Sequence, residues 1–146
     1  MKIEIKIDEN CAEPKVIVVT ARVTEEINEI VRRLSDEPSQ ILAGFKDGQA
    51  AVLEPEHIYR VYAADGKVYA ETKNETYSLR LRLYETEQRL ANRSFARISN
   101  GELINLKKVK NFDLNFAGTI CVSLSNGTVT YVSRRYVSKI KQLLGL

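Results

Sequence analysis

The pattern of apolar and polar positions divides the chain into a short N-terminal part and a longer part made of strand-like segments. Isoleucine stands at every second position of residues 2–8, between charged residues, which is the period-2 pattern of a half-buried strand. Residues 16–23 begin with a continuous β-branched run and predict a second, more buried strand. In residues 24–34 apolar side chains recur at helical spacing behind Thr24, a residue type that caps helices. We therefore expect a β-β-α region over residues 1–44.

The helix of this N-terminal region is expected to end in residues 36–39, which contain a proline. The region is too short for the receiver domain of about 120 residues that many bacterial regulators carry. Phosphorelay control of the usual form is therefore not expected. The acidic region could instead serve dimerisation, dock a regulator, or add framework to the rest of the chain.

From Gln40 onward, short apolar segments follow one another at intervals of about 8 to 12 residues, a spacing typical of an all-β sandwich or barrel. Tight turns are predicted at Asp47-Gly48, Asp65-Gly66 and Asn126-Gly127. Residues 77–83 alternate in the manner of a strand, and helical segments are expected around residues 84–90 and from Ser133 onward. The predicted fold class is mostly β (α+β), with short antiparallel strands and short helices.

Charge is distributed unevenly along the chain. Residues 1–57 contain 7 Lys/Arg and 12 Asp/Glu, a net charge of −5, whereas residues 58–146 contain 15 Lys/Arg and 7 Asp/Glu, a net charge of +8. All seven tyrosines lie in the basic part. A basic domain behind an acidic region suggests an anionic partner, most commonly nucleic acid, although a solvated basic surface explains the charge equally well.

Few residues in the chain are suited to catalysis or metal binding. Cys11 and Cys121 are far apart and lack CxxC spacing, and His57 is the single histidine, so we expect no zinc site, no other metal and no cofactor. The sequence has no Gly-rich phosphate loop, no GxSxG motif and no carboxylate pair beside a nucleophile, so no enzymatic activity is expected. Without a signal-peptide pattern or an apolar stretch of about 18 residues, we expect a cytoplasmic chain that does not insert into membranes.

Residues 94–109 combine residue types that suit a nucleic-acid-binding surface. Apolar side chains such as Phe95 are interleaved with polar ones such as Arg97 and Asn100. Lysines and arginines neutralise phosphates, and a planar amide such as that of Asn100 can pair with an adenine edge in the major groove. Asn100-Gly101 is also a common turn sequence, so a purely structural role is the alternative.

The same segment resembles the central motif of the LytTR family of DNA-binding domains. The residues that carry the resemblance are Phe95, Arg97, Ile98, Ser99, Asn100 and Leu103-Ile104-Asn105-Leu106. The family's first strands and short helix, its last hairpin and its terminal motif resemble residues 58–69, 77–80, 83–90, 119–124, 126–128 and 132–136. The resemblance covers residues 45–146 and implies a stand-alone LytTR-like DNA-binding domain without a receiver.

This resemblance implies a compact β fold that inserts loops, and not a recognition helix, into successive major grooves of a short operator repeat. The base-reading positions that it implies fall on Ser99, Asn100 and Arg135, and near Gly66 or Lys67. These residues are the expected base contacts.

The chain departs from the family pattern inside the central motif. Many members have His-Arg or His-Asn at Ser99-Asn100, a serine at Gly101 and an aromatic residue at Glu102. An exposed acid beside the groove would repel phosphate. We therefore expect Glu102 either to point inward or to alter the preferred DNA sequence.

Contacts to phosphate are expected from Arg97, Lys107, Lys108, Arg134 and Lys139. Arg134 and Arg135 have an argument of their own, because the first turn of a helix disfavours cations, whereas beside DNA they and the N–H groups behind them would meet a phosphate or a guanine edge. Exposed arginines paired with nearby acids are the alternative. For Lys107 and Lys108 the alternative is protection of an exposed strand edge.

The leading hypothesis is a transcription regulator that binds double-stranded DNA, with each domain reading a short half-site and a homodimer on a repeated operator. A membrane-bound inhibitor is a further partner that the resemblance permits, because LytTR proteins without a receiver are often paired with one. The alternative is an RNA or single-stranded nucleic-acid-binding module that uses tyrosines as stacking platforms. Alternation places most tyrosines on predicted strands whose partners are apolar, which favours core packing for them.

Overall fold

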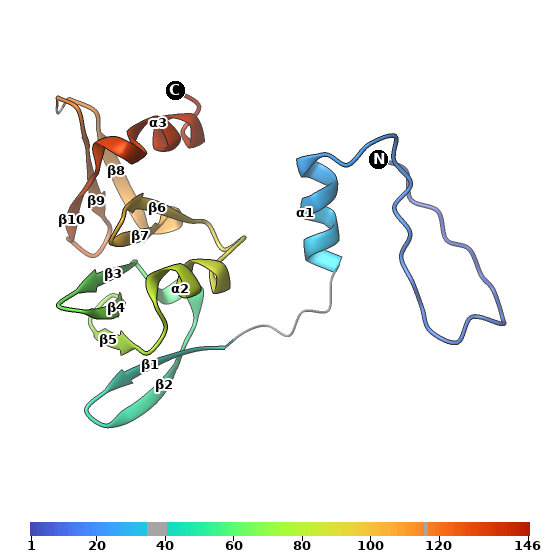
Figure 1. The fold of residues 1–146 in the computed structure, drawn as a ribbon, viewed down its shortest axis with the longest axis horizontal. Helices are drawn as coiled ribbons and strands as arrows, with labels where there is room; N and C mark the ends of the chain where they lie inside the picture. Colours follow the sequence, from blue (N-terminus) through green and yellow to red (C-terminus); the bar gives the residue numbers. More distant parts are fainter. Residues whose placement is uncertain (35–40, 116) are drawn as a thin grey trace. The chain divides into compact units, whose positions relative to one another are not determined.

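The computed structural model describes residues 1–34, 41–115 and 117–146 (Figure 1). The chain forms two compact units, Met1–Pro38 and Ser39–Leu146. This division lies before the expected boundary between residues 44 and 45, because strand β1 (Leu42–Lys46) pairs with strands of the second unit. The predicted helix end in residues 36–39 lies outside the described residues.

The N-terminal unit contains the predicted helix, α1 (Glu25–Leu34). The Oγ1 of Thr24 accepts a hydrogen bond from the N–H of Ile27 at 3.4 Å, which satisfies one of the free amides of the first turn and confirms the predicted cap. Acidic residues in the first turn and arginines in the last complement the helix dipole. No residue of α1 is buried, although its apolar side chains form one stripe.

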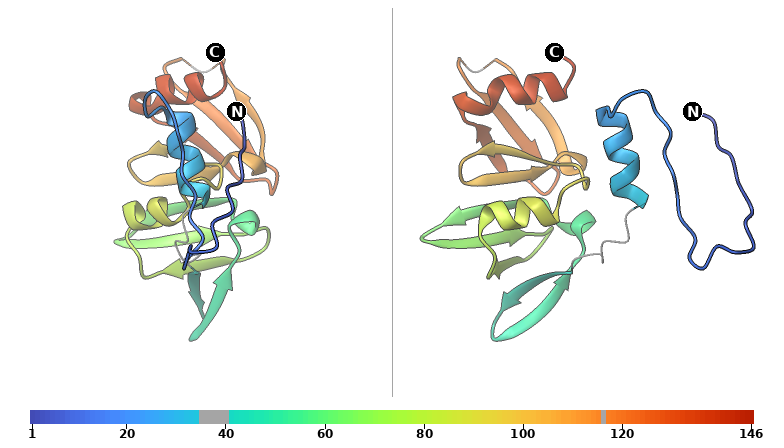
Figure 2. Two further views of the ribbon diagram at one scale, coloured as in Figure 1. Left: turned by 90° about the vertical axis from the view of Figure 1, so that its right-hand side faces the viewer. Right: turned by 45° about the vertical axis from the view of Figure 1, so that its right-hand side comes forward.

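The two predicted strands of the N-terminal unit are not formed. Residues 2–8 and 16–23 follow an extended path and contain no strand (Figure 2). Ile3, Ile5 and Ile7 are 85%, 89% and 88% exposed. A strand needs a neighbour for its backbone N–H and C=O groups, and two strands alone are marginally stable at best in water. The prediction of a β-β-α region was therefore wrong in its strands and correct in its helix.

The C-terminal unit consists of two antiparallel sheets. The larger is seven-stranded in the order β2-β1-β5-β4-β3-β7-β6, and the smaller is three-stranded in the order β10-β9-β8. The strands after β1 are β2 (Gln49–Leu53), β3 (Arg60–Ala64), β4 (Lys67–Glu71), β5 (Thr76–Leu79), β6 (Phe95–Ser99), β7 (Glu102–Asn105), β8 (Val109–Asp113), β9 (Ile120–Leu124) and β10 (Val129–Val132). The 3-10 helices η1 (Pro55–His57) and η2 (Leu106–Lys108) precede β3 and β8. The mostly β fold class is confirmed.

Each of the three predicted tight turns connects two antiparallel strands. Asp47 and Gly48 have φ of 50° and 78°, and Asp65 and Gly66 have φ of 51° and 74°. Positive φ at both central residues gives a turn whose twist matches that of the flanking strands, which is why Asp-Gly is favoured there. Gly127 has φ of 94° in the turn between β9 and β10.

The predicted strand over residues 77–83 is shorter than expected. β5 ends at Leu79, and the expected short helix, α2 (Leu83–Arg89), begins at Leu83. The carboxylate of Glu85 accepts a hydrogen bond from the N–H of Arg82 at 3.2 Å, so the chain leaves the strand to form a helix start.

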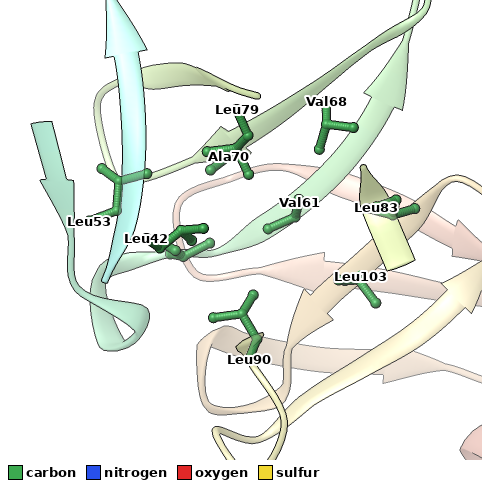
Figure 3. Close-up of a cluster of buried hydrophobic side chains, with 10 residues drawn as sticks. Leu42, Leu53, Val61, Val68, Ala70, Leu79, Leu83, Leu90 and Leu103 are labelled. Atoms are coloured by element: carbon green, nitrogen blue, oxygen red, sulfur yellow. The ribbon is translucent and has the colours of Figure 1, made fainter. Parts of the chain in front are cut away.

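Two apolar clusters hold the C-terminal unit together. In the first, Leu83 and Leu90 from the α2 segment meet strand residues of the seven-stranded sheet such as Val61 and Leu103 (Figure 3). The second cluster joins the three-stranded sheet to helix α3 (Arg134–Leu143) and to β6. Its fully buried members are Ile98, Ile104, Ile120, Val122, Leu124, Val132 and Ile140. The second cluster therefore fixes where α3 starts relative to the end of β6.

Candidate nucleic-acid interface

Two hairpin turns of the C-terminal unit lie side by side. The first is the turn between β3 and β4, at residues 65–66, and the second is the turn between β6 and β7, at residues 100–101. β3 and β7 are antiparallel neighbours, and the N–H of Ala63 donates to the carbonyl of Gly101 at 2.8 Å. The end of β3 therefore meets the start of β7, and both turns lie at the same end of the sheet.

The start of α3 lies at this end as well (Figure 1). The N–H of Ser133 donates to the carbonyl of Ile98, near the end of β6, at 2.8 Å. One turn further along α3, the hydroxyl of Tyr136 donates to the Oδ1 of Asn100 at 3.2 Å. We call these two turns and the first turn of α3 the reading end of the C-terminal unit.

Asn100 is the exposed tip of the second turn. The sequence allowed either a turn or an exposed contact residue at this position. The structure has both features, because Asn100-Gly101 forms a turn and Asn100 is exposed. The neighbouring Ser99 is half-buried, and its Oγ accepts a hydrogen bond from the N–H of Gly101 at 3.2 Å. A register shift between Arg97 and Ser99 bends β6 just before the turn.

Tyr136 is a residue of the reading end that the sequence analysis did not select. Its helical spacing predicts a core position, and the ring is indeed packed against the second apolar cluster. The hydroxyl extends beyond that cluster and holds the Asn100 amide. Tyrosine in place of phenylalanine or leucine on an apolar stripe was the available signal, since a buried ring with a polar tip usually binds a partner.

The predicted basic and base-reading residues of this end come from separate elements. Lys67 follows the first turn and is exposed, and Arg134 and Arg135 are exposed in the first turn of α3. The guanidinium of Arg134 lies beside Gly118, where a Cβ would be 3.3 Å from the arginine Nε. Lys139 is exposed one turn beyond Arg135. The fold thus brings Lys67, Asn100 and the arginine pair to one end of the unit.

Arg97 has partners within the chain, which differs from its expected role at a phosphate. Its Nε donates to the carbonyl of Ser99 at 2.7 Å, and its Nη2 donates to the carbonyl of Asn100. Its Nη1 pairs with Glu87 at 3.1 Å, and its side chain is 17% exposed. Arg97 therefore holds the backbone of the turn that carries Asn100.

Lys107 and Lys108 are not brought to the reading end. They lie in η2, after the last residue of β7, whereas the Asn100 turn precedes the first residue of that strand. The ammonium of Lys108 lies 5.2 Å from the centroid of the Tyr59 ring. Lys107 is exposed. The two lysines and Asn100 therefore lie at opposite ends of β7.

Glu102 points into the unit, which agrees with the first of the two expected positions. Its side chain is 13% exposed, and its carboxylate accepts from the Thr130 hydroxyl at 2.8 Å and from Arg60 Nη1 at 3.4 Å. Burial raises the pKa of Glu102 above its ordinary value, against the opposing effects of the Thr130 hydrogen bond and the Arg60 charge. The acid is therefore engaged by partners within the unit.

Arg60 connects this carboxylate to a second one. Its Nη2 lies 3.3 Å from Glu71 Oε1, and the Oε2 of Glu71 accepts from Asn126 Nδ2 at 3.1 Å and from the Thr128 hydroxyl at 2.9 Å. Arg60 and Glu71 belong to the seven-stranded sheet, while Asn126 and Thr128 lie in the turn between β9 and β10. The network therefore joins the two sheets behind the reading end.

The described residues contain no group of three or more His, Cys, Asp or Glu side chains placed to hold a metal ion. Across the same residues, no helix has both the length and the apolar character needed to cross a membrane. Cys11 is exposed and Cys121 is buried, and both are free thiols.

The chain is similar over its whole length to bacterial regulators. An uncharacterised HTH-type transcriptional regulator of Staphylococcus aureus (strain NCTC 8325) is 29% identical over 147 residues, covering 100% of this chain and 99% of the relative. A regulator of the same description from strain MRSA252 is 28% identical with the same coverage. Although these names indicate a helix-turn-helix class, strands β6 to β10 separate α2 from α3 in this chain.

A solved structure shares the fold of the chain, and a family model identifies the domain. The LytTr DNA-binding domain of a protein described as a methyl-accepting/DNA response regulator from Bacillus cereus shares the fold, with a TM-score of 0.69 at 24% identity over 73% of this chain and 97% of that chain. The family model of the LytTr DNA-binding domain matches residues 48–145, which confirms the resemblance seen over residues 45–146. The chain belongs to the LytTR family of DNA-binding domains.

Proposed function

We propose that the chain is a sequence-specific transcription regulator that inserts the reading end into the major groove of double-stranded DNA. The observation that carries this proposal is the convergence of Lys67, Asn100 and Arg135 from three separate segments. An amide and a guanidinium are the side-chain groups that recognise adenine and guanine edges with paired hydrogen bonds. Because each group stands on a hairpin tip or a helix start, it can reach base edges without a recognition helix.

The surrounding charge supports an anionic partner. Residues 58–146 carry a net charge of +8, and Arg134 and Lys139 are exposed beside Arg135. Cations in the first turn of α3 are locally unfavourable, so their placement there favours contact with phosphate. The inward position of Glu102 removes the acid that would oppose it.

The proposed partners are double-stranded DNA and a second copy of the chain on a repeated operator, with action in the cytoplasm. One reading end covers a short half-site, so a repeat engaged by two copies would lengthen the recognised sequence. The family resemblance adds a membrane-bound inhibitor as a further candidate partner, which holds the regulator off DNA.

Single-stranded nucleic acid is a weaker candidate because several tyrosines have partners within the chain. The rings of Tyr62 and Tyr69 stack on each other with centroids 5.5 Å apart, Arg60 lies 4.3 Å over Tyr62, and Tyr59 is 8% exposed. Rings engaged in this way are not free platforms for bases.

Selection of binding sequences from a random duplex library tests the proposal. We expect an enriched repeat, and we expect Asn100→Ala and Arg135→Ala each to weaken binding to it by about 1 to 3 kcal/mol and to relax one base position. Asn74→Ala and Arg93→Ala are matched controls, because both residues are exposed at turns away from the reading end. A library without an enriched motif, or a chain that prefers the single strand of the same sequence, contradicts the proposal.

A further inference from the structure

The N-terminal unit exposes apolar side chains that a folded chain normally covers. Besides the three isoleucines of residues 2–8, Val16 and Ile17 are each 70% exposed and Val19 is 93% exposed. Exposed apolar residues clustered in this way mark an interaction surface. On α1, Val31 and Leu34 add to these side chains, since they are 47% and 54% exposed.

Residues 2–8 already have the side-chain arrangement of one strand. The ammonium of Lys2 lies 3.2 Å from Glu4 Oε1, so side chains two positions apart share a face, as they do in extended backbone. The charged residues therefore form one face of the segment, and Ile3, Ile5 and Ile7 form the other. Backbone hydrogen bonds from a second strand are the missing component.

We infer that this second strand is the same segment of another copy of the chain, paired antiparallel about Ile5. This register places Lys2 opposite Asp8 and Glu4 opposite Lys6 on one face. On the other face it places Ile3 opposite Ile7 and Ile5 opposite itself. Opposite charges and apolar pairs directly across from each other stabilise antiparallel strands, and the arrangement has the two-fold symmetry of a closed dimer.

The neighbouring registers do not fit the sequence. Shifting the antiparallel pair by two residues places Lys2 opposite Lys6 in one direction and Glu4 opposite Asp8 in the other, both repulsive. A shift by one residue puts isoleucines opposite charged side chains. Parallel in-register pairing aligns each charge with its own copy. The pairing about Ile5 is thus selected by charge as well as by the apolar face.

Dimerisation also explains why the N-terminal unit of a single chain forms no sheet. The N-terminal unit of one chain supplies at most two strands, residues 2–8 and 16–23, and two strands are marginally stable in water. Two chains supply four strands with one apolar face, and the apolar stripes of two α1 helices can cover that face. The surface belongs to the N-terminal unit and shares no residue with the reading end, so we expect the dimer to form without DNA.

Sedimentation velocity of the full chain without DNA tests the inference. We expect a concentration-dependent dimer, and we expect Ile5→Lys to raise its Kd at least about a hundredfold, because two buried isoleucines are lost and two ammonium groups face each other. Glu4→Lys and Lys6→Glu should each weaken the dimer, whereas the double variant Glu4→Lys/Lys6→Glu restores it. Mixing the two single variants should produce a heterodimer. A monomeric wild-type chain, or a dimer that Ile5→Lys leaves unchanged, overturns the inference.

Disulfide formation separates the two strand directions. In a Cys11→Ser background, Ile5→Cys places two thiols across the symmetry axis and should cross-link efficiently. Ile3→Cys should not cross-link, because the two copies of residue 3 are about 13 Å apart in this register. Efficient cross-linking through Ile3→Cys indicates parallel pairing and overturns the proposed geometry. Binding of each variant to a single half-site reports on the DNA function alone, so the failure of one proposal is distinguishable from failure of the other.

Discussion

The two units of this chain differ in where their side chains find partners. In the C-terminal unit, apolar residues such as Ile98 and Ile140 are fully buried, and charged residues such as Arg97 and Glu102 have partners within the chain. In the N-terminal unit, the isoleucines of residues 2–8 are exposed to solvent. The fraction of apolar residues is similar in the two units, but these residues form a buried core in the C-terminal unit and stay exposed in the N-terminal unit. The reason is that a stable sheet needs enough strands as well as an apolar face.

The largest expected difference between the units concerns isoleucine truncation. Ile104→Ala should destabilise the C-terminal unit by about 2 to 5 kcal/mol, because Ile104 is fully buried and its removal leaves a cavity. Ile7→Ala, in the N-terminal unit, should change the same unfolding transition by less than about 0.5 kcal/mol. Urea unfolding followed by circular dichroism measures both. Similar losses for the two variants would mean that the N-terminal isoleucines pack on the C-terminal core.

Sequence patterns predicted the C-terminal unit well because its local signals agree with its tertiary contacts. Asp65-Gly66 forms its turn through positive φ at both residues, and Ile98, Leu103 and Ile104 of the family motif are buried. In residues 2–8 the alternation predicted a strand that is not formed, because periodicity contains no information on whether a partner strand exists. Local patterns therefore identify a face more reliably than they identify what covers it.

At the reading end, the sequence predicted a set of contact residues but not the partners that some of them have within the chain. Asn100 is exposed as its motif predicts, whereas Arg97, a basic residue in the same motif, holds backbone carbonyls. A guanidinium suits a phosphate and a carbonyl equally well, so residue type alone does not distinguish the two roles. Asn100 precedes β7 and Lys107 follows it, so the two residues lie at opposite ends of this strand.

The second prediction concerns Arg97, whose partners within the chain imply positioning and not phosphate binding. Arg97→Ala should weaken duplex binding by about 1 to 3 kcal/mol, because the Asn100 turn loses charge-assisted hydrogen bonds. The slope of log Kd against log salt should stay unchanged, whereas loss of a phosphate contact lowers the slope by about 0.9. Arg97→Lys should not restore binding, since an ammonium cannot hold two carbonyls with the same fork. Arg134→Ala is the comparison variant, for which we expect the salt slope to fall.

The third prediction isolates the hydroxyl of Tyr136. Tyr136→Phe keeps the ring in the apolar cluster and removes the hydrogen bond to Asn100, so duplex binding should weaken by about 0.5 to 1.5 kcal/mol with little change in unfolding. Tyr84→Phe, at an exposed position on α2, is the matched control. Fluorescence anisotropy with one labelled half-site measures both variants. Equal affinities for Tyr136→Phe and the wild type would show that Asn100 does not depend on this hydroxyl.

The smallest effect is expected at Glu102, and it depends on pH. Burial raises the pKa of Glu102 in the folded chain above the ordinary 4.5, so the folded state binds this proton more tightly than the unfolded state does. Its contribution to stability is therefore fully present below pH 4.5 and is lost as the pH rises through the raised pKa. Glu102→Gln remains neutral at every pH. The free energy of unfolding of this variant should therefore increase relative to that of the wild type as the pH rises.

Unfolding of the two proteins in urea between about pH 4 and pH 8 measures this difference, with the exposed Glu54→Gln as control. A difference that moves the opposite way would mean that Arg60 and Thr130 stabilise the carboxylate more than burial opposes it. The selected DNA sequence should be the same for Glu102→Gln and the wild type, because the carboxylate has its partners, Thr130 and Arg60, within the chain. An altered base preference would instead place Glu102 among the residues that contact DNA. The C-terminal unit would then also contain a side chain whose partner lies outside the chain, as we infer for the isoleucines of the N-terminal unit.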